Sequence, residues 1–273
     1  MWLLLAGSLL SLQFWLPLSL SLLIVTFILA AVHNTLTPVG IAIIIFLSVI
    51  AYLSFRFRER RIYRICLEVV LVLASIALTM HFVPGFNNLK VLDSVDVGPQ
   101  SAPFTMYYNL DKALIPFLLL ACLPTLFKAR SVQPPAAWLW FILILSVPAL
   151  LVLAVYIGGL QFEQHRPEWI WQFILSNIFF VSLAEEALFR GYLQQRLTSV
   201  MSPKIALVIT SALFGLLHYA GGVQLIIFAG LAGIIYGLAW MWSGRLWVAT
   251  LFHFGLNLTH LLFFTYPVYL PRW

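Results

Sequence analysis

Residues 136–159 read AAWLWFILILSVPALLVLAVYIGG, and stretches of this kind decide the fold. The stretch contains no charged side chain and is long enough to cross a bilayer as a helix. The rest of the chain is similar: 63% of its 273 residues are hydrophobic, 9% are charged, and the mean hydropathy is +1.01. A soluble domain of this length could not bury so much apolar surface. The sequence therefore predicts an integral, multi-pass membrane protein.

We expect an all-α, polytopic transmembrane helix bundle of about nine spans, with eight to ten as the range. The other predicted spans are residues 40–55, 65–83, 113–127, 169–195, 204–220, 223–242 and 246–265. Residues 1–33 form either one long tilted helix or a tight pair broken at Pro17.

Residues 84–112 are the longest polar stretch and are predicted to form an external loop, with a substrate-gating cap as the alternative. We expect residues 1–160 to be N-terminal spans that include this loop. Residues 161–273 are expected to be a core that carries the chemical motifs. The two parts are predicted to form one integrated membrane domain.

The formal charge is +6, and five of the fifteen basic residues fall in one short stretch. Its five arginines are Arg56, Arg58, Arg60, Arg61 and Arg64. A basic cluster beside a membrane span favours the cytoplasmic side, so this loop is predicted to be cytoplasmic. Such a cluster also binds anionic lipid head groups, which makes the lipid bilayer a predicted partner. In a bacterium the location would be the plasma or inner membrane. No solvated basic module is present, which argues against nucleic-acid binding.

Three predicted spans contain polar residues that are expensive to bury at bilayer depth. The first contains AEEALFR, residues 184–190. Glu186 and Arg190 are four residues apart, share a helix face and can pair. Glu185 points about 100° away from Glu186 on a helix, so it is freer to face another group.

The second span contains FGLLH, residues 214–218, and the third contains HFGLN, residues 253–257. At 1.5 Å per residue from the nearest cytoplasmic basic residue, Glu185 is roughly 16 Å deep and His218 roughly 21 Å. His253 and Asn257 are roughly 12 and 18 Å deep on the same measure. We therefore expect these four side chains to meet in one slab of the membrane.

Such a meeting supports amide hydrolysis. A carboxylate and a histidine can hold and deprotonate a water, and a second histidine with an asparagine amide can stabilise an oxyanion. Glu185, His218 and His253 could instead supply the two-histidine, one-carboxylate set of a catalytic zinc. Buried Glu, His and Asn also occur in transporters. Phe214 is expected to pack against His218, and His260 to be structural.

Together, the motifs resemble the CAAX-protease and bacteriocin-processing (Abi) family of intramembrane endopeptidases, which includes the eukaryotic Ras-converting endopeptidase. The resemblance rests on Glu185-Glu186 with Arg190, Phe214 with His218, and His253 with Asn257. It implies a glutamate-activated water with no cofactor, and a membrane-associated protein or peptide as substrate.

By the resemblance, Glu185 and His218 activate the water and His253 and Asn257 form the oxyanion hole. Arg190 and Glu186 order the site. The alternatives are a non-catalytic scaffold or immunity protein of the same family, a zinc-dependent protease, or a transporter.

Overall fold

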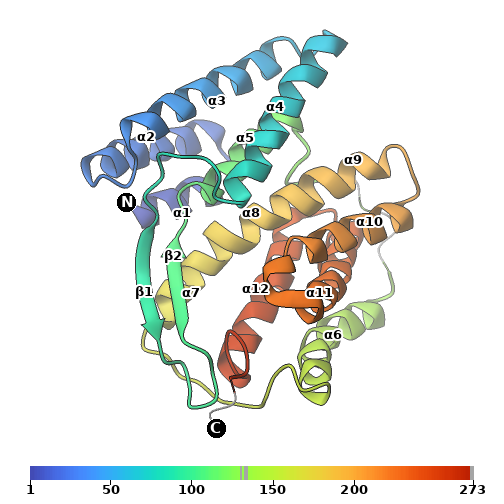
Figure 1. Ribbon diagram of the computed structural model, residues 1–273. Helices are drawn as coiled ribbons and strands as arrows, with labels where there is room; N and C mark the ends of the chain where they lie inside the picture. Colours follow the sequence, from blue (N-terminus) through green and yellow to red (C-terminus); the bar gives the residue numbers. More distant parts are fainter. Residues whose placement is uncertain (130, 132–134, 271–273) are drawn as a thin grey trace.

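The protein is described by a computed structural model that covers residues 1–129, 131 and 135–270 (Figure 1). The helices before the chemical motifs are α1 (Trp2–Ser11), α2 (Leu16–Val32), α3 (Pro38–Arg56), α4 (Arg61–Thr79), η1 (Lys112–Leu114), α5 (Ile115–Cys122) and α6 (Ala137–Tyr156). The last helices are α10 (Pro203–Leu216), η4 (Tyr219–Gly221), α11 (Gly222–Ser243) and α12 (Leu246–Phe263).

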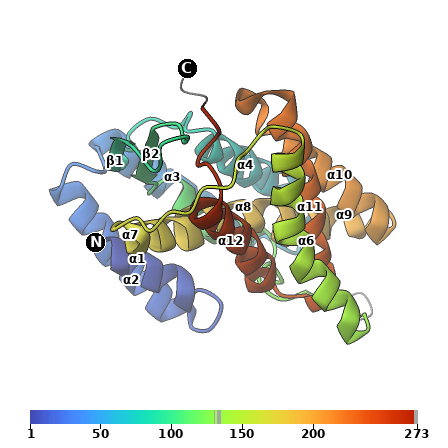
Figure 2. The ribbon, with the colours of Figure 1, turned by 90° about the horizontal axis from the view of Figure 1, so that it is seen from below.

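One continuous helix, Ile170–Thr198, runs through the middle of the molecule. Its segments are α7 (Ile170–Leu175), η2 (Ser176–Ser182), α8 (Leu183–Glu186), η3 (Ala187–Gln194) and α9 (Gln195–Thr198), of which η2 and η3 are π-helical. Helices α1–α5 lie on one side of it, and α6, α10, α11 and α12 lie on the other (Figures 1 and 2). The paired glutamates therefore occupy α8, a short α-helical stretch between two wider helical turns.

In the described residues, six helices are long and apolar enough to cross a membrane, so the expected count of about nine spans is not confirmed. They are residues 38–56, 61–79, 137–156, 170–198, 219–243 and 246–263. The predicted span 113–127 is shorter, because the helix ends at Cys122, just before Leu123 turns extended ahead of Pro124. The predicted span 204–220 ends as α10 at Leu216.

Residues 1–33 form a pair of helices, α1 and α2, which settles the choice left open by the sequence. Pro17 lies at the start of α2, where its missing amide hydrogen costs the helix nothing. The division at residue 160 and the cytoplasmic side of the arginine loop stay predictions.

The expectation of an all-α fold was wrong for residues 84–112. Strands β1 (Leu89–Val95) and β2 (Phe104–Tyr108) pair there as an antiparallel hairpin. β2 consists of residue types that favour strands, and it alternates as a strand does: Met106 and Tyr108 are buried while Tyr107 is exposed. The polar loop of the prediction is thus an ordered hairpin that meets the central helix near its N-terminal end, where β2 packs against η2 (Figure 1).

A buried polar cluster ties the hairpin to the other end of the chain. The Glu163 carboxylate accepts hydrogen bonds from the Ser101 hydroxyl and, at 2.9 Å, from the Gln100 amide. Nε2 of His165 lies 2.9 Å from the same carboxylate, and its Nδ1 donates to the Leu261 carbonyl at 2.6 Å. Burial raises the pKa of Glu163, but hydrogen bonds from Ser101, Gln100 and His165 outweigh burial, so the pKa is lowered overall.

We predict that Glu163→Gln destabilises the protein by about 1.5–3 kcal/mol at neutral pH, because it weakens hydrogen bonds to a charged acceptor. The lowered pKa means that the charged carboxylate stabilises the fold above the ordinary glutamate pKa of 4.5. That contribution disappears as the pH falls through the lowered value. The wild-type and variant melting temperatures in detergent should therefore converge on acidification. The exposed Glu168, changed to Gln, is the control and should melt like wild type at every pH.

Candidate active site

Glu186 lies at the centre of the candidate site. Its side chain is fully buried at the end of α8, in the middle of the bundle. Its Oε1 accepts a hydrogen bond from Nη1 of Arg190 at 3.1 Å, and Nδ1 of His253 donates to the same oxygen at 2.9 Å. The pair predicted from the four-residue spacing is therefore present, and it extends to α12 through His253.

Arg190 carries this network to α11. The guanidinium is fully buried, and its Nη2 donates to the Gly233 carbonyl at 2.9 Å. A Cβ at position 233 would lie 3.1 Å from that nitrogen, so the close approach favours glycine. The Arg190 guanidinium also lies over the Phe214 ring, 4.6 Å from its centroid. Phe214 therefore contacts Arg190 as well as His218, against which it was predicted to pack.

His253 is held in one orientation by two contacts. Its ring stacks on Tyr236 with centroids 4.7 Å apart and an interplanar angle of 11°. Its Nδ1 faces Glu186, which leaves Nε2 as the ring nitrogen that this carboxylate does not engage. The arrangement resembles the way carboxylates orient catalytic histidines elsewhere, where the partner at one nitrogen fixes what the other can do.

Glu185 has different partners from its neighbour in the sequence. Its Oε1 lies 3.3 Å from Nζ of Lys112, and the Glu185 side chain is 13% exposed. His218 and His253 are close enough to interact with Glu185 electrostatically. Sequence reasoning missed Lys112, since this residue was placed at the outer end of a polar loop. Its position before a short apolar run was the only available signal.

His218 and Asn257 are both held by hydrogen bonds. Nδ1 of His218 donates to the Phe214 carbonyl at 2.8 Å, one turn back in α10. Nδ2 of Asn257 donates to Oδ1 of Asn177 at 3.2 Å, and that oxygen also accepts from the Ser182 hydroxyl at 3.1 Å. Asn177 is 7% exposed in η2 and was not singled out from the sequence, because no spacing connects it with Asn257.

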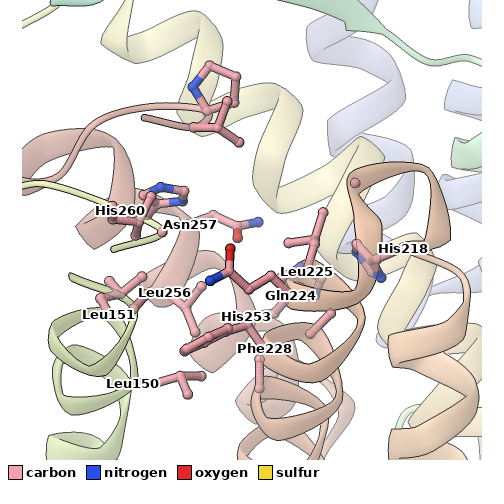
Figure 3. A pocket seen from close by; sticks show the side chains of 18 of the residues that line it. Leu150, Leu151, His218, Gln224, Leu225, Phe228, His253, Leu256, Asn257 and His260 are labelled. Atoms are coloured by element: carbon pink, nitrogen blue, oxygen red, sulfur yellow. The ribbon is translucent and has the colours of Figure 1, made fainter. Parts of the chain in front are cut away.

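A cavity of about 250 Å³ brings three of the four predicted catalytic residues together. His218, His253 and Asn257 line it, and the Gln224 and Asn257 side chains point into the same space (Figure 3). Its other walls are mostly apolar and include Leu150, Leu151, Leu225, Phe228 and Leu256. Glu185, the fourth predicted catalytic residue, is not part of the lining, but it is within electrostatic reach of two lining histidines, His218 and His253.

The residues do not form a metal-ligand cluster. In the described part of the chain, no three His, Cys, Asp or Glu side chains are grouped so that they could hold a metal ion. The alternative zinc set of Glu185, His218 and His253 is therefore not assembled in this arrangement. Each of the three instead has a protein partner: Lys112, the Phe214 carbonyl and Glu186.

Comparison with known proteins gives one match. Residues 167–259 match a family model described as type II CAAX prenyl endopeptidase Rce1-like. No curated protein and no solved structure matches the chain. The matched segment contains all three motifs, from Glu185 to Asn257. Over residues 167–259 this chain is thus similar to the CAAX-protease family of membrane endopeptidases, as the motifs predicted.

Proposed function

We propose that this protein is an intramembrane endopeptidase that hydrolyses a peptide bond of a membrane-associated protein or peptide, using a water activated by Glu185 and His218. The family match supports the protease class. One observation carries the mechanism: the two adjacent glutamates have separate partners. Glu186 is engaged by Arg190 and His253 with no exposed surface, whereas Glu185 is 13% exposed and pairs with Lys112.

The proposed reaction needs no covalent intermediate. The Glu185 carboxylate takes a proton from the water as the water oxygen bonds to the substrate carbonyl carbon. His218 holds this water from the cavity wall. The carbon–nitrogen bond then breaks, and Glu185 passes the proton to the leaving nitrogen. Glu186 is the less suitable base of the two, because its Oε1 already accepts from Arg190 and His253 and its Oε2, which has no hydrogen-bond partner among the described residues, is fully buried.

Two donors stabilise the oxyanion in this proposal. They are Nε2 of His253 and Nδ2 of Asn257, from side chains one turn apart on α12 that line the same cavity. Glu186 balances the positive charge of the His253 ring when both ring nitrogens carry protons. Asn177 orients the Asn257 amide through the hydrogen bond at 3.2 Å. Both donors are thus fixed before the substrate binds, which is how such groups act most strongly.

The cavity walls indicate the kind of substrate. Leucine and phenylalanine side chains surround a small polar group of histidine, asparagine and glutamine. An extended peptide with apolar side chains fits such a lining, because its backbone amides can meet the polar groups while its side chains contact the apolar wall. Substrates near the membrane surface or inside it meet this description.

We predict that Glu185→Gln abolishes cleavage and leaves the protein folded in the membrane. The measurement compares the proteomes of membranes that contain wild type or variant at matched expression. One or a few precursor proteins should accumulate uncut with the variant. Glu168→Gln, which changes an exposed glutamate outside the site, is the control and should process these precursors normally. If the Glu185→Gln membranes show the wild-type protein pattern and phenotype, the chain is a non-catalytic scaffold instead.

Asn257→Ala should lower kcat by about 10²–10³-fold, the usual effect of removing one oxyanion donor. Asn177→Ala should cause a smaller loss, because it frees the Asn257 amide without removing it. Both are measured by single-turnover cleavage of a precursor found in the preceding comparison. Unchanged turnover in Asn257→Ala would remove this residue from the oxyanion hole.

A further inference from the structure

Lys112 and Glu185 form an ion pair that joins the hairpin side of the molecule to the central helix. Nζ of Lys112 lies 3.3 Å from Oε1 of Glu185, and the two side chains are 14% and 13% exposed. Charges this sheltered interact more strongly than surface charges, because little water screens them.

The backbone at Lys112 is held in place by a neighbouring polar cluster. The Asp111 carboxylate, 2% exposed, accepts a hydrogen bond from the Lys112 amide at 2.8 Å and from the Asn88 side chain at 3.0 Å. His81 also pairs with this carboxylate. The cluster fixes the turn between β2 and η1, so Lys112 begins its helix from a defined point.

A second contact sets the depth of Lys112 in the bundle. Nη2 of Arg196 donates to the Cys122 carbonyl at 3.2 Å, which pins the end of α5 to the end of the central helix. Two segments lead away from this contact: residues 112–122, which include α5, and residues 185–196 of the central helix. They run side by side, since α5 packs against η3. At 1.5 Å per residue both paths cover roughly 16 Å. Lys112 therefore lies at the level of the paired glutamates.

The other charged and titratable groups near Glu185 have hydrogen-bond partners of their own, except Tyr236, whose ring stacks on His253. They are Glu186 and Arg190 on the same helix, Tyr236 on α11, His218 after α10 and His253 on α12. Arg190 bonds Glu186 and the Gly233 carbonyl, and His253 bonds Glu186. In the described residues, Lys112 is the one cation in direct hydrogen-bonding contact with Glu185.

We propose that Lys112 is a positioning residue that keeps the Glu185 carboxylate ionised and correctly oriented for water activation. The inference rests on the proposed function, because it matters only if Glu185 is the base. A general base must be unprotonated to accept the proton of water. An ammonium ion at 3.3 Å favours the charged carboxylate, whereas burial near the cavity disfavours it. Lys112 therefore extends the activity of the site to lower pH.

The test compares Lys112→Met and Lys112→Arg with wild type and Glu185→Gln, as purified proteins in detergent, on a precursor identified by the proteome comparison. Lys112→Met should lose, at neutral pH, part of the roughly 10²–10⁴-fold that a positioned base contributes to kcat. The acidic limb of its pH–rate profile should move to higher pH, with KM little changed. Lys112→Arg keeps the cation and should restore most of the activity and the wild-type profile.

A second measurement needs no substrate. Infrared difference spectra during a pH titration report protonation of carboxyl groups, and the band lost in Glu185→Gln belongs to this residue. In Lys112→Met this band should appear at higher pH than in wild type, and in Lys112→Arg it should not move.

Three outcomes separate the claims. An unshifted band and pH–rate profile in Lys112→Met, with Glu185→Gln inactive, overturn the role of Lys112 and leave the proposed function standing. Equal loss of activity in the Met and Arg variants at every pH, with lowered melting temperatures, also overturns it and indicates a purely structural contact. Wild-type cleavage by Glu185→Gln overturns the proposed function itself.

Discussion

The fully buried contact of Glu186 with Arg190 and His253 is the constraint on which the rest of this protein depends. A lone charge at this depth would be strongly unfavourable, so the carboxylate, the guanidinium and the imidazole must be arranged together. Arg190 also donates a hydrogen bond to the Gly233 carbonyl of α11, and the His253 ring stacks on Tyr236 of the same helix. The central helix, α11 and α12 are thereby fixed relative to one another by polar contacts inside an apolar bundle.

This arrangement has a chemical consequence. Once Glu186 is engaged by two partners, its neighbour Glu185 faces a different side of the helix, toward Lys112 and the histidines of the cavity. Under the proposed function, the same helix presents one structural and one reactive carboxylate in adjacent positions. In our account the hairpin also takes part in the site, since Lys112 follows the last residue of β2 by four positions and is anchored by the Asp111 cluster.

The local parts of this picture could be predicted from the sequence. The four-residue spacing gave the Glu186–Arg190 pair, and counting residues from the basic span ends placed His218, His253 and Asn257 in one region. The contacts that sequence reasoning missed are non-local. The partners of Glu185 and Asn257 lie 73 and 80 residues away, where no periodicity connects them.

The errors in the fold have a similar origin. The apolar run at residues 113–127 looked long enough to cross the membrane, yet its helix ends at Cys122. The two π-helical segments on either side of α8 widen the helix, and the pattern of hydrophobic residues gave no indication of them. The hairpin was hidden by the polar composition of residues 84–112 and by their prolines and asparagines, although β2 itself has strand-forming residues.

Thermal unfolding of purified Glu185→Gln and Glu186→Gln tests whether the two adjacent glutamates have separate tasks. Glu186→Gln leaves the buried Arg190 without its charge partner and should lower stability by about 3–5 kcal/mol, with a clear fall in melting temperature. Glu185→Gln should melt much closer to wild type, since its amide oxygen can still accept a hydrogen bond from the partly exposed Lys112. Equal melting temperatures for the two variants, or a larger loss in Glu185→Gln, would contradict the account.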